Sequence, residues 1–425
     1  MYHIAKTAFS FFACIAFAFL LPRCQSSKTE KEKTVNGITI IELPQPTPLS
    51  KAEFIRIDTN CRNWYDTVLA VKGFNGSMLV AKNGTIVFEK YNGTGHLPGK
   101  DTITAFTPFH VASVSKTFTA MAVLKLLQEN KLVLDDELVN YFPQFNYPGV
   151  TIRTLLNHRS GIPNYPYFMD KLWDKTKYCS NEDVLHILIT KKDSIENIAI
   201  PNTKFSYSNT NYALLALLIE KISGMKYADY MQQNIFTPLQ MNNSFVFSLK
   251  DTLTQNPSYD WKGRLIKCNF LDSVYGDKNI YTTARDLLIW DRALAAGKIV
   301  NPEIQQLAYT PYSMEHAGVH NYGLGWRMST FSNGKKIIYH NGWWHGNNAC
   351  FIRLLQENAT IIVIGNKFTR AIYTARQLSN LFGDYFMQEE EEEMENTKPA
   401  DSLSVKKIKL PIETNTKKKF LQKKF

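Results

Sequence analysis

The chain has 425 residues, 44% of them hydrophobic and 20% charged, which is enough apolar material for one large core or two medium ones. Its formal net charge of +11 comes largely from residues 396–425, where nine lysines stand against Asp401 and Glu413 and contribute +7. A block of like charge with little apolar content is usually a solvated tail, so we expect no nucleic-acid partner. The alternative for this tail is contact with an anionic membrane, because apolar residues are interleaved with its last lysines.

Residues 1–24 predict an export signal. Residues 8–21 form an uncharged apolar run of signal-peptide length that is too short to span a membrane comfortably as a lone helix. In a lipoprotein signal Cys24 would carry the lipid, although Pro22 and Arg23 stand where small residues usually precede such a cysteine. We therefore expect an exported protein, periplasmic or held at the cell-envelope membrane through its N-terminus. The alternative is an uncleaved membrane anchor.

Residues 25–50 are charged and proline-rich, have no core pattern and are predicted to be a linker. The folded domain is expected over residues 51–387, with a charged, disordered tail over residues 388–425. Near the start of the domain, two alternating apolar runs flank Asn83-Gly84. They predict a β-hairpin, because this dipeptide readily adopts positive φ at both turn positions.

The order of the remaining elements predicts the fold class. A helix is expected around residues 58–71, and helical patterns dominate from about Lys116 to Leu294. Four β-rich runs follow between residues 323 and 366, and a helix over residues 370–386 closes the domain. This order predicts an α+β fold of two lobes: an antiparallel sheet built from both chain ends and flanked by helices, and an inserted lobe that is mostly helical. A site is then expected in the cleft between the lobes.

Ser113 and Lys116 are the first candidate catalytic residues. They lie at the start of a predicted amphipathic helix that continues to Asn130. Residues three apart share a helix face, whereas Ser115 points about 100° away from its neighbour Lys116. The Ser-x-x-Lys spacing occurs three more times, at a helix-ending glycine, in a turn and in the tail, beginning at Ser223, Ser332 and Ser404. Only Ser113 lies at a helix start, where developing negative charge is favoured.

Two further groups of residues follow Ser113 in a defined order. Tyr207 and Asn209 stand in a loop just before a predicted helix, and His340-Asn341-Gly342 follows a β run. Singly, these residues have ordinary explanations: a packed aromatic ring, a turn residue and a strand-end histidine. In the order SxxK, YxN and HxG they resemble the serine β-lactamase and penicillin-binding-protein superfamily, in particular its class C β-lactamase-like serine hydrolases.

The resemblance covers about residues 76–386 and implies a mechanism. Ser113 would attack a carbonyl and form an acyl-enzyme, with Lys116 and Tyr207 as the acid/base machinery. Asn209 would bind a substrate carbonyl and hold Lys116. A lysine can accept the serine proton only if desolvation or a second cation lowers its pKa from about 10.4.

The third group is expected to bind and orient the substrate through His340, Asn341, Gly342 and Trp343. The resemblance implies an oxyanion hole made by the backbone N–H groups of Ser113 and Trp343. Gly342 would let the strand edge approach the substrate closely. The chemistry needs neither a metal nor an organic cofactor.

One departure from the family bears on the substrate. β-Lactamases and many D-alanyl-D-alanine peptidases have a lysine and a hydroxyl residue where this chain has His340 and Asn341, and histidine is largely neutral near pH 7. We therefore expect an esterase or a peptidase of D-amino-acid or cell-wall type, with a small ester, amide or peptide as substrate. The pair Trp343-Trp344 suggests an apolar substrate group. The alternatives are a β-lactamase or penicillin-binding protein, and a non-catalytic binding protein with the same fold.

The cysteines and the other histidines predict no metal site. His316 and His320 have helical metal-ligand spacing, but they lie beside glycine in a predicted loop without a carboxylate. His158 resembles a structural turn of the family. The cysteines after the leader show no CxxC and no regular spacing, so we expect small buried hydrophobic residues at Cys61, Cys179, Cys268 and Cys350.

Overall fold

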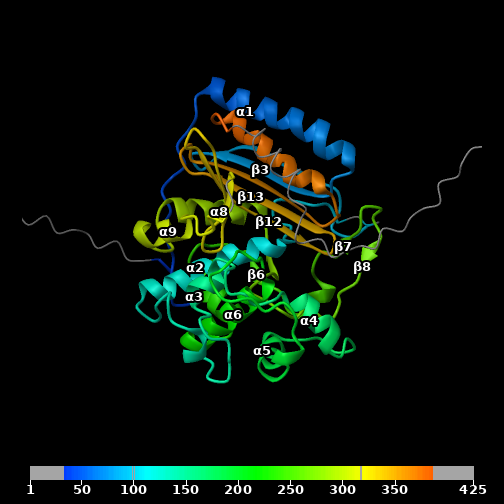
Figure 1. The fold of residues 1–425 in the computed structure, drawn as a ribbon. Coiled ribbons are helices and arrows are strands. Elements are labelled where there is room, and N and C mark those ends of the chain that lie inside the picture. The colour runs from blue at the N-terminus through cyan, green and yellow to red at the C-terminus, as the bar shows by residue number, and fades with distance from the viewer. Residues whose placement is uncertain (1–32, 98, 100, 316–317, 386–425) are drawn as a thin grey trace, which may run out of the picture.

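The largest sheet takes strands from both ends of the domain, as predicted (Figure 1). The computed structural model describes residues 33–97, 99, 101–315 and 318–385. Within them this sheet has seven antiparallel strands in the order β10–β11–β12–β13–β14–β3–β4, so the first hairpin of the domain pairs with the last strand. The strands are β3 (Gly76–Lys82), β4 (Thr85–Asn92), β10 (His320–Tyr322), β11 (Arg327–Thr330), β12 (Lys336–Trp344), β13 (Asn347–Leu354) and β14 (Ala359–Gly365).

The β3–β4 hairpin has the predicted turn. Asn83 and Gly84 have φ values of 53° and 74°, and Lys82 pairs directly with Thr85. A two-residue loop with both φ angles positive matches the twist of the strands that it joins.

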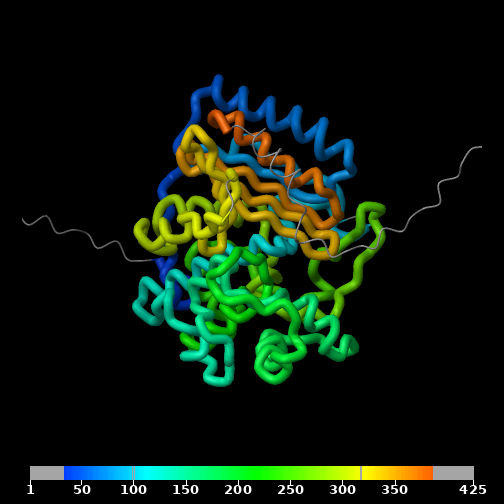
Figure 2. The backbone as a smooth tube through the Cα atoms, viewed as in Figure 1, coloured from blue at the N-terminus to red at the C-terminus, as the bar shows by residue number. Residues whose placement is uncertain are grey.

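The sheet separates two cores because successive side chains of a strand point to opposite faces. On β3, Met78 packs into one core and Leu79 into the other. The face of Met78 is covered by α1 (Lys51–Trp64) and by the 3-10 helix η8 (Arg370–Leu381), which run side by side (Figures 1 and 2). The opposite face is covered by α8 (Ala284–Ala295) and merges with the core of the helical lobe.

α2 (Ser115–Gln128) runs through the helical lobe and is buried on all sides. The predicted helix is therefore present, but its predicted amphipathic character is wrong, because eleven of its fourteen residues are buried. Its surface is covered by α6 (Asn209–Ser223) and α9 (Pro302–Ala308), among other elements. The remaining α-helices are α3 (Ile152–Leu156), α4 (Tyr165–Leu172), α5 (Asn181–Thr190) and α7 (Tyr227–Met231). The short strands are β1 (Thr34–Val35), β2 (Ile38–Thr39), β5 (Phe109–His110), β6 (Phe245–Val246), β7 (Ser258–Tyr259), β8 (Leu265–Ile266) and β9 (Ile280–Thr282).

Two predicted helix boundaries differ from the structure. The first helix begins at Lys51 rather than near residue 58, because Ser50 caps it by accepting a hydrogen bond from the Glu53 N–H at 3.2 Å. Its first turn is largely exposed and therefore carries no apolar period. The closing helix, predicted over residues 370–386, is a 3-10 helix that ends at Leu381.

The segment predicted as a linker is part of the fold where the structure describes it. Ile40 is buried, and the Ile41 N–H donates to the Pro238 carbonyl of the helical lobe at 2.8 Å. Further along, the Thr47 N–H donates to the Asn83 carbonyl of the sheet lobe at 3.0 Å. Residues 40–50, the last part of the predicted linker, therefore contact both lobes.

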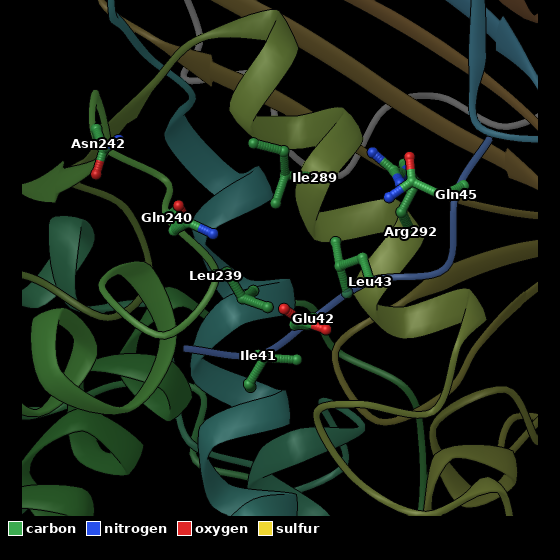
Figure 3. Close-up of a pocket in the computed structure, with 9 residues that line it drawn as sticks. All are labelled: Ile41, Glu42, Leu43, Gln45, Leu239, Gln240, Asn242, Ile289 and Arg292. Atoms are coloured by element: carbon green, nitrogen blue, oxygen red, sulfur yellow. The ribbon is translucent and has the colours of Figure 1, made fainter. Parts of the chain in front are cut away.

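This joining segment also lines a surface hollow (Figure 3). The hollow measures about 490 Å³, and none of the predicted site residues lines it. Its walls come from the joining segment, the turn before β6 and α8: Ile41, Glu42, Leu43, Gln45, Leu239, Gln240, Asn242, Ile289 and Arg292.

The predicted export signal with Cys24, and the lysine-rich tail, lie outside the described residues. Among the helices of residues 33–385 that the structure describes, none combines the length and the apolar character that a membrane span requires. Cys61, Cys179 and Cys350 are buried as expected, whereas Cys268 is exposed.

Candidate active site

Ser113 lies in the short 3-10 turn η3 (Ala112–Val114) that leads from β5 into α2. Ala112, just before it, has φ 47°, a conformation that costs a residue with a Cβ atom free energy. The Ala112 N–H is held by the buried His110 ring, whose Nδ1 accepts it at 3.1 Å. Ser113 itself is only partly buried, unlike its neighbours Ala112 and Val114.

Lys116 is buried one turn further along and contacts Ser113 as predicted. Its Nζ lies 3.1 Å from Ser113 Oγ. The same nitrogen donates to Asn209 Oδ1 at 2.7 Å and to the backbone carbonyl of Asp277 at 2.8 Å. It also lies 5.0 Å from the centre of the Tyr207 ring. One amine thus joins the first two predicted motifs.

Tyr207 and Asn209 are positioned by the start of α6. Ser208 precedes the helix in an extended conformation, and Asn209 is its first residue. The Asn209 N–H donates to Asn164 Oδ1 at 2.8 Å, which fixes the first turn. The Tyr207 ring packs on the buried His158 ring, with the centroids 4.2 Å apart.

His158 is a buried support beneath Tyr207. It has φ 58°, and its Nδ1 accepts the Ser208 N–H at 3.2 Å. Burial, with Lys116 and Arg327 nearby, holds the pKa of His158 well below its usual range, so the ring is neutral near pH 7. These features agree with a structural turn.

The third predicted motif lies within β12, where that strand passes η3. β11 pairs with β12 only as far as Tyr339, so the edge from His340 to Trp344 is not covered by β11. A Cβ atom on Gly342 would lie 2.2 Å from the Val111 carbonyl oxygen. The absence of a side chain therefore allows the strand and the nucleophile turn to touch.

The side chains around Gly342 differ in exposure. Asn341 has a buried Oδ1 without a hydrogen-bond partner among the described residues. Trp343 is 46% exposed, and its indole N–H donates to the His345 carbonyl at 2.8 Å. The Gly342 carbonyl accepts a hydrogen bond from the Tyr373 hydroxyl at 2.9 Å, which fixes the strand from the η8 side.

His340 is completely buried. Its Nε2 lies 3.1 Å from the Tyr322 hydroxyl, and its Nδ1 lies 2.7 Å from its neighbour's backbone carbonyl, that of Asn341. Burial, and then the charges of Arg327 and Lys116, hold the pKa of His340 well below its usual range, so the ring is neutral near pH 7. This direction of the pKa shift agrees with the neutral imidazole expected at His340. Both ring nitrogens already contact protein atoms.

Two important residues were missed in the sequence. Arg327 on β11 places its guanidinium 5.0 Å from the centre of the Tyr207 ring, on the same residue that Lys116 contacts. Asp277 holds Lys116 through a backbone carbonyl, which every residue type possesses. The sequence therefore could not reveal the role of Asp277. The role of Arg327 could have been suspected, because this arginine lies at the start of a predicted strand next to the strand with the HxG motif.

The described residues give no support to a metal centre. They contain no group of three or more histidine, cysteine or acidic side chains that could hold an ion. His320 contacts Ser329 Oγ at 3.2 Å, and His316 lies outside the described residues.

Comparison with known proteins identifies the family. The family model described as Beta-lactamase matches residues 70–379. The chain is 31% identical over 319 residues to penicillin-binding protein 4* of Bacillus subtilis, which covers 71% of this chain and 70% of that protein. It is 26% identical over 322 residues to a D-aminopeptidase of Brucella canis, covering 73% of this chain but only 59% of the relative.

Solved structures agree on the fold. A penicillin-binding protein from Bacillus halodurans superposes with a TM-score of 0.66 at 24% identity, covering 75% of this chain and 98% of its own. A D-stereospecific amidohydrolase from Streptomyces gives 0.57 at 21% identity, covering 77% and 98%. The chain therefore belongs to the beta-lactamase family, and the prediction of a serine hydrolase of the β-lactamase and penicillin-binding-protein type is confirmed.

Proposed function

We propose that the protein hydrolyses an amide or peptide bond through an acyl-enzyme on Ser113. The observation that carries this proposal is the set of oxygens around Lys116 Nζ. Asn209 Oδ1 and the Asp277 carbonyl can only accept hydrogen bonds, so they occupy both N–H groups of a neutral amine. The lone pair of that amine then faces Ser113 Oγ, which is the arrangement that a general base requires.

The reaction follows from this arrangement. Ser113 Oγ bonds to the substrate carbonyl carbon while its proton moves to Lys116 Nζ. Tyr207 passes a proton to the leaving nitrogen as the C–N bond breaks. Positive charge on Lys116 and on Arg327, each 5.0 Å from the Tyr207 ring centre, stabilises negative charge on the phenol during this transfer. Lys116 then returns the serine proton to the Tyr207 phenolate, so that the amine is neutral again. Water attacks the acyl carbon and gives a proton to Lys116, and this proton passes to Ser113 Oγ as the Oγ–C bond breaks and the acid leaves.

The oxyanion is assigned to the backbone N–H groups of Ser113 and Trp343. The close approach of Gly342 to Val111 brings the two segments that carry these groups together. Because β11 leaves this part of β12 uncovered, an extended substrate can pair with it as an added strand. His340 supports the strand from beneath through Tyr322 and does not contact the substrate in this proposal.

The substrate is proposed to be a peptide or amide with a carboxylate near the scissile bond. The relatives include proteins named D-aminopeptidase and D-stereospecific amidohydrolase. A neutral His340 cannot form an ion pair with a substrate carboxylate. Arg327 lies beside Tyr207, so among the cations of β11 and β12 we assign the carboxylate to Arg327. The exposed face of Trp343 fits an apolar side group.

The location proposed for this activity is the cell envelope, with the N-terminus as a membrane attachment and Cys24 as a lipid site. This rests on the sequence of the leader alone. Labelling with a radioactive fatty acid in the producing cell, with Cys24→Ser as the control, tests the attachment.

Kinetics on a matched substrate panel test the proposed activity. The panel contains D- and L-amino-acid p-nitroanilides, p-nitrophenyl esters, a chromogenic cephalosporin, and D-peptides with either a free carboxylate or a capped amide end. The wild-type protein should favour the D-peptide with a free carboxylate. Arg327→Met should reduce the ratio of kcat/KM between free and capped peptides more than about tenfold. An unchanged ratio would remove Arg327 from substrate binding, and highest turnover of the cephalosporin would favour the β-lactamase alternative.

A further inference from the structure

A second buried lysine, Lys278, lies next to the residue that holds Lys116. Lys278 and Asp277 have side-chain exposures of 3% and 2%, and Lys278 Nζ lies 3.6 Å from Asp277 Oδ1. Lys278 Nζ also donates to the Tyr165 hydroxyl, which in turn donates to Asp277 Oδ2 at 3.1 Å. The Val274 carbonyl accepts a further hydrogen bond from Lys278 Nζ at 3.0 Å. Lys278 and Asp277 thus form one buried cluster with Tyr165, in which Asp277 Oδ1 has no hydrogen-bond partner among the described residues.

The cluster is connected directly to the proposed base. The backbone carbonyl of Asp277 accepts the hydrogen bond from Lys116 Nζ, so the position of this carbonyl depends on where its own side chain is held. The main chain on either side is also fixed. Gly276 has φ 90° and its carbonyl accepts a hydrogen bond from Thr119 on α2, while the Ile280 N–H donates to Ser115 Oγ. Residues 276–280 are therefore held against the first turns of α2 by hydrogen bonds.

A buried ion pair has a cost that simple packing does not require. Removing two charges from water is unfavourable, and apolar residues of similar volume often stabilise a core equally well. Lys278 is moreover covered by the Trp344 ring, whose centre lies 4.8 Å from Nζ. A stability role alone therefore does not explain why charges occur at this place.

We propose that Lys278 is a positioning residue for catalysis: with Asp277 it fixes the carbonyl that orients Lys116, and its positive charge balances the Asp277 carboxylate so that Lys116 rests as a neutral base. This inference rests on the proposed function. Without Lys278, the carboxylate of Asp277 would stabilise a protonated Lys116. Without the Asp277 carboxylate, Lys278 would repel that proton more strongly.

Other titratable groups also face the two lysines and remain the same in the variants below. Around Lys116 they are Ser113, Tyr207, Tyr212, His158 and His340, with Arg327 beyond Tyr207. Around Lys278 they are Tyr165, Asp272, Cys179 and His110. Burial lowers the pKa of Lys278, while Asp277 and then Asp272 oppose this shift.

The test is the pH dependence of covalent labelling by a fluorophosphonate, measured as a second-order rate for the full mature chain. In Lys278→Met the acidic limb of the rate–pH profile should move to higher pH by about half a unit or more, because Lys116 then stays protonated up to a higher pH. In the nearly isosteric Asp277→Asn the limb should move to lower pH. The double variant should return toward the wild-type limb, since both charges are then absent.

Opposite shifts of the acidic limb in the two single variants would show an effect of charge. A loss of structure would instead lower the labelling rate of both variants. Asp277→Asn tests the claim by itself if Lys278→Met does not fold, as judged by circular dichroism and thermal unfolding. If folded variants show the same acidic limb of the rate–pH profile as the wild type, the role of Lys278 is overturned and the proposed function is unaffected. Absence of any wild-type adduct at every pH would instead overturn the proposed function.

Discussion

Lys116 is held by oxygen atoms from separate parts of the chain: Ser113 on its own turn, Asn209 at the start of α6 and the Asp277 carbonyl. None of these oxygens carries a formal charge. Burial of an amine disfavours its ammonium form, which agrees with the role proposed for Lys116 as a base. The orientation of the base thus depends on three loops and helix ends that must all be in place.

Residue-scale electrostatics also affect stability, and His110 gives the clearest case. Burial lowers the pKa of His110 to about 4, while an unfolded histidine titrates near 6.5. Between these values the unfolded chain binds a proton that the folded chain does not, so the free energy of unfolding falls as the pH decreases below about 6.5. His110 should contribute about 1.4 kcal/mol per pH unit to this loss.

His110→Asn should therefore flatten the pH dependence, because asparagine keeps an acceptor for the Ala112 N–H but cannot be protonated. Urea unfolding at pH 7, 6 and 5 measures the slope in both proteins. Parallel slopes for wild type and variant would show that His110 is not neutral in the folded protein.

At the scale of elements, the contact between β12 and η3 decides whether the site is assembled. Gly342→Ala places a Cβ atom 2.2 Å from the Val111 carbonyl oxygen, so β12 must move away from the nucleophile turn. Because the Trp343 N–H, one of the two proposed oxyanion donors, lies just beyond this position, kcat should fall by about 10²-fold or more.

Gly334→Ala is the matched control for this change. Gly334 lies in the turn between β11 and β12, has φ 80°, and has open space where a Cβ atom would stand. This variant should lose about 1 kcal/mol of stability and keep its kcat. Equal kcat for both variants would contradict the assignment of the β12 edge to the oxyanion hole.

The same scale shows what the sequence could predict. The hairpin at Asn83-Gly84, the late strands and the one-turn spacing of Ser113 and Lys116 are local patterns, and the structure has them. Burial of α2 on all sides is not local, since it depends on which elements surround it. Residues 40–50 were predicted to be a linker because their few apolar residues, which pack against the two cores, are separated by prolines and polar residues and follow no regular period. The Asp277 carbonyl was unpredictable because it is a backbone group, which every residue type possesses.

At the scale of the whole molecule, a buried ion pair joins α8 to the sheet. Arg353 on β13 donates from Nε to Asp291 on α8, and both side chains are almost completely buried. Removing one partner leaves the other charge buried and unpaired, so Arg353→Met should lower the free energy of unfolding by about 3–5 kcal/mol.

A double-mutant cycle with Asp291→Leu tests this contact. The Arg353→Met/Asp291→Leu protein should recover most of the loss, because neither charge then remains in the core. Urea unfolding at neutral pH gives the four free energies. Strictly additive losses would show that the two residues act independently and that the layers are held by apolar packing alone.

The central claim is that Ser113 is an activated nucleophile. The most direct measurement is the intact mass of the protein lacking residues 1–24 after brief exposure to a fluorophosphonate, compared with Ser113→Ala and Ser115→Ala. Ser115 is completely buried and accepts the Ile280 N–H at 3.1 Å, so it is a matched serine that the reagent should not reach. We predict a single adduct on the wild type and on Ser115→Ala, and none on Ser113→Ala. An unlabelled, folded wild-type protein, or an adduct that persists in Ser113→Ala, would contradict the account.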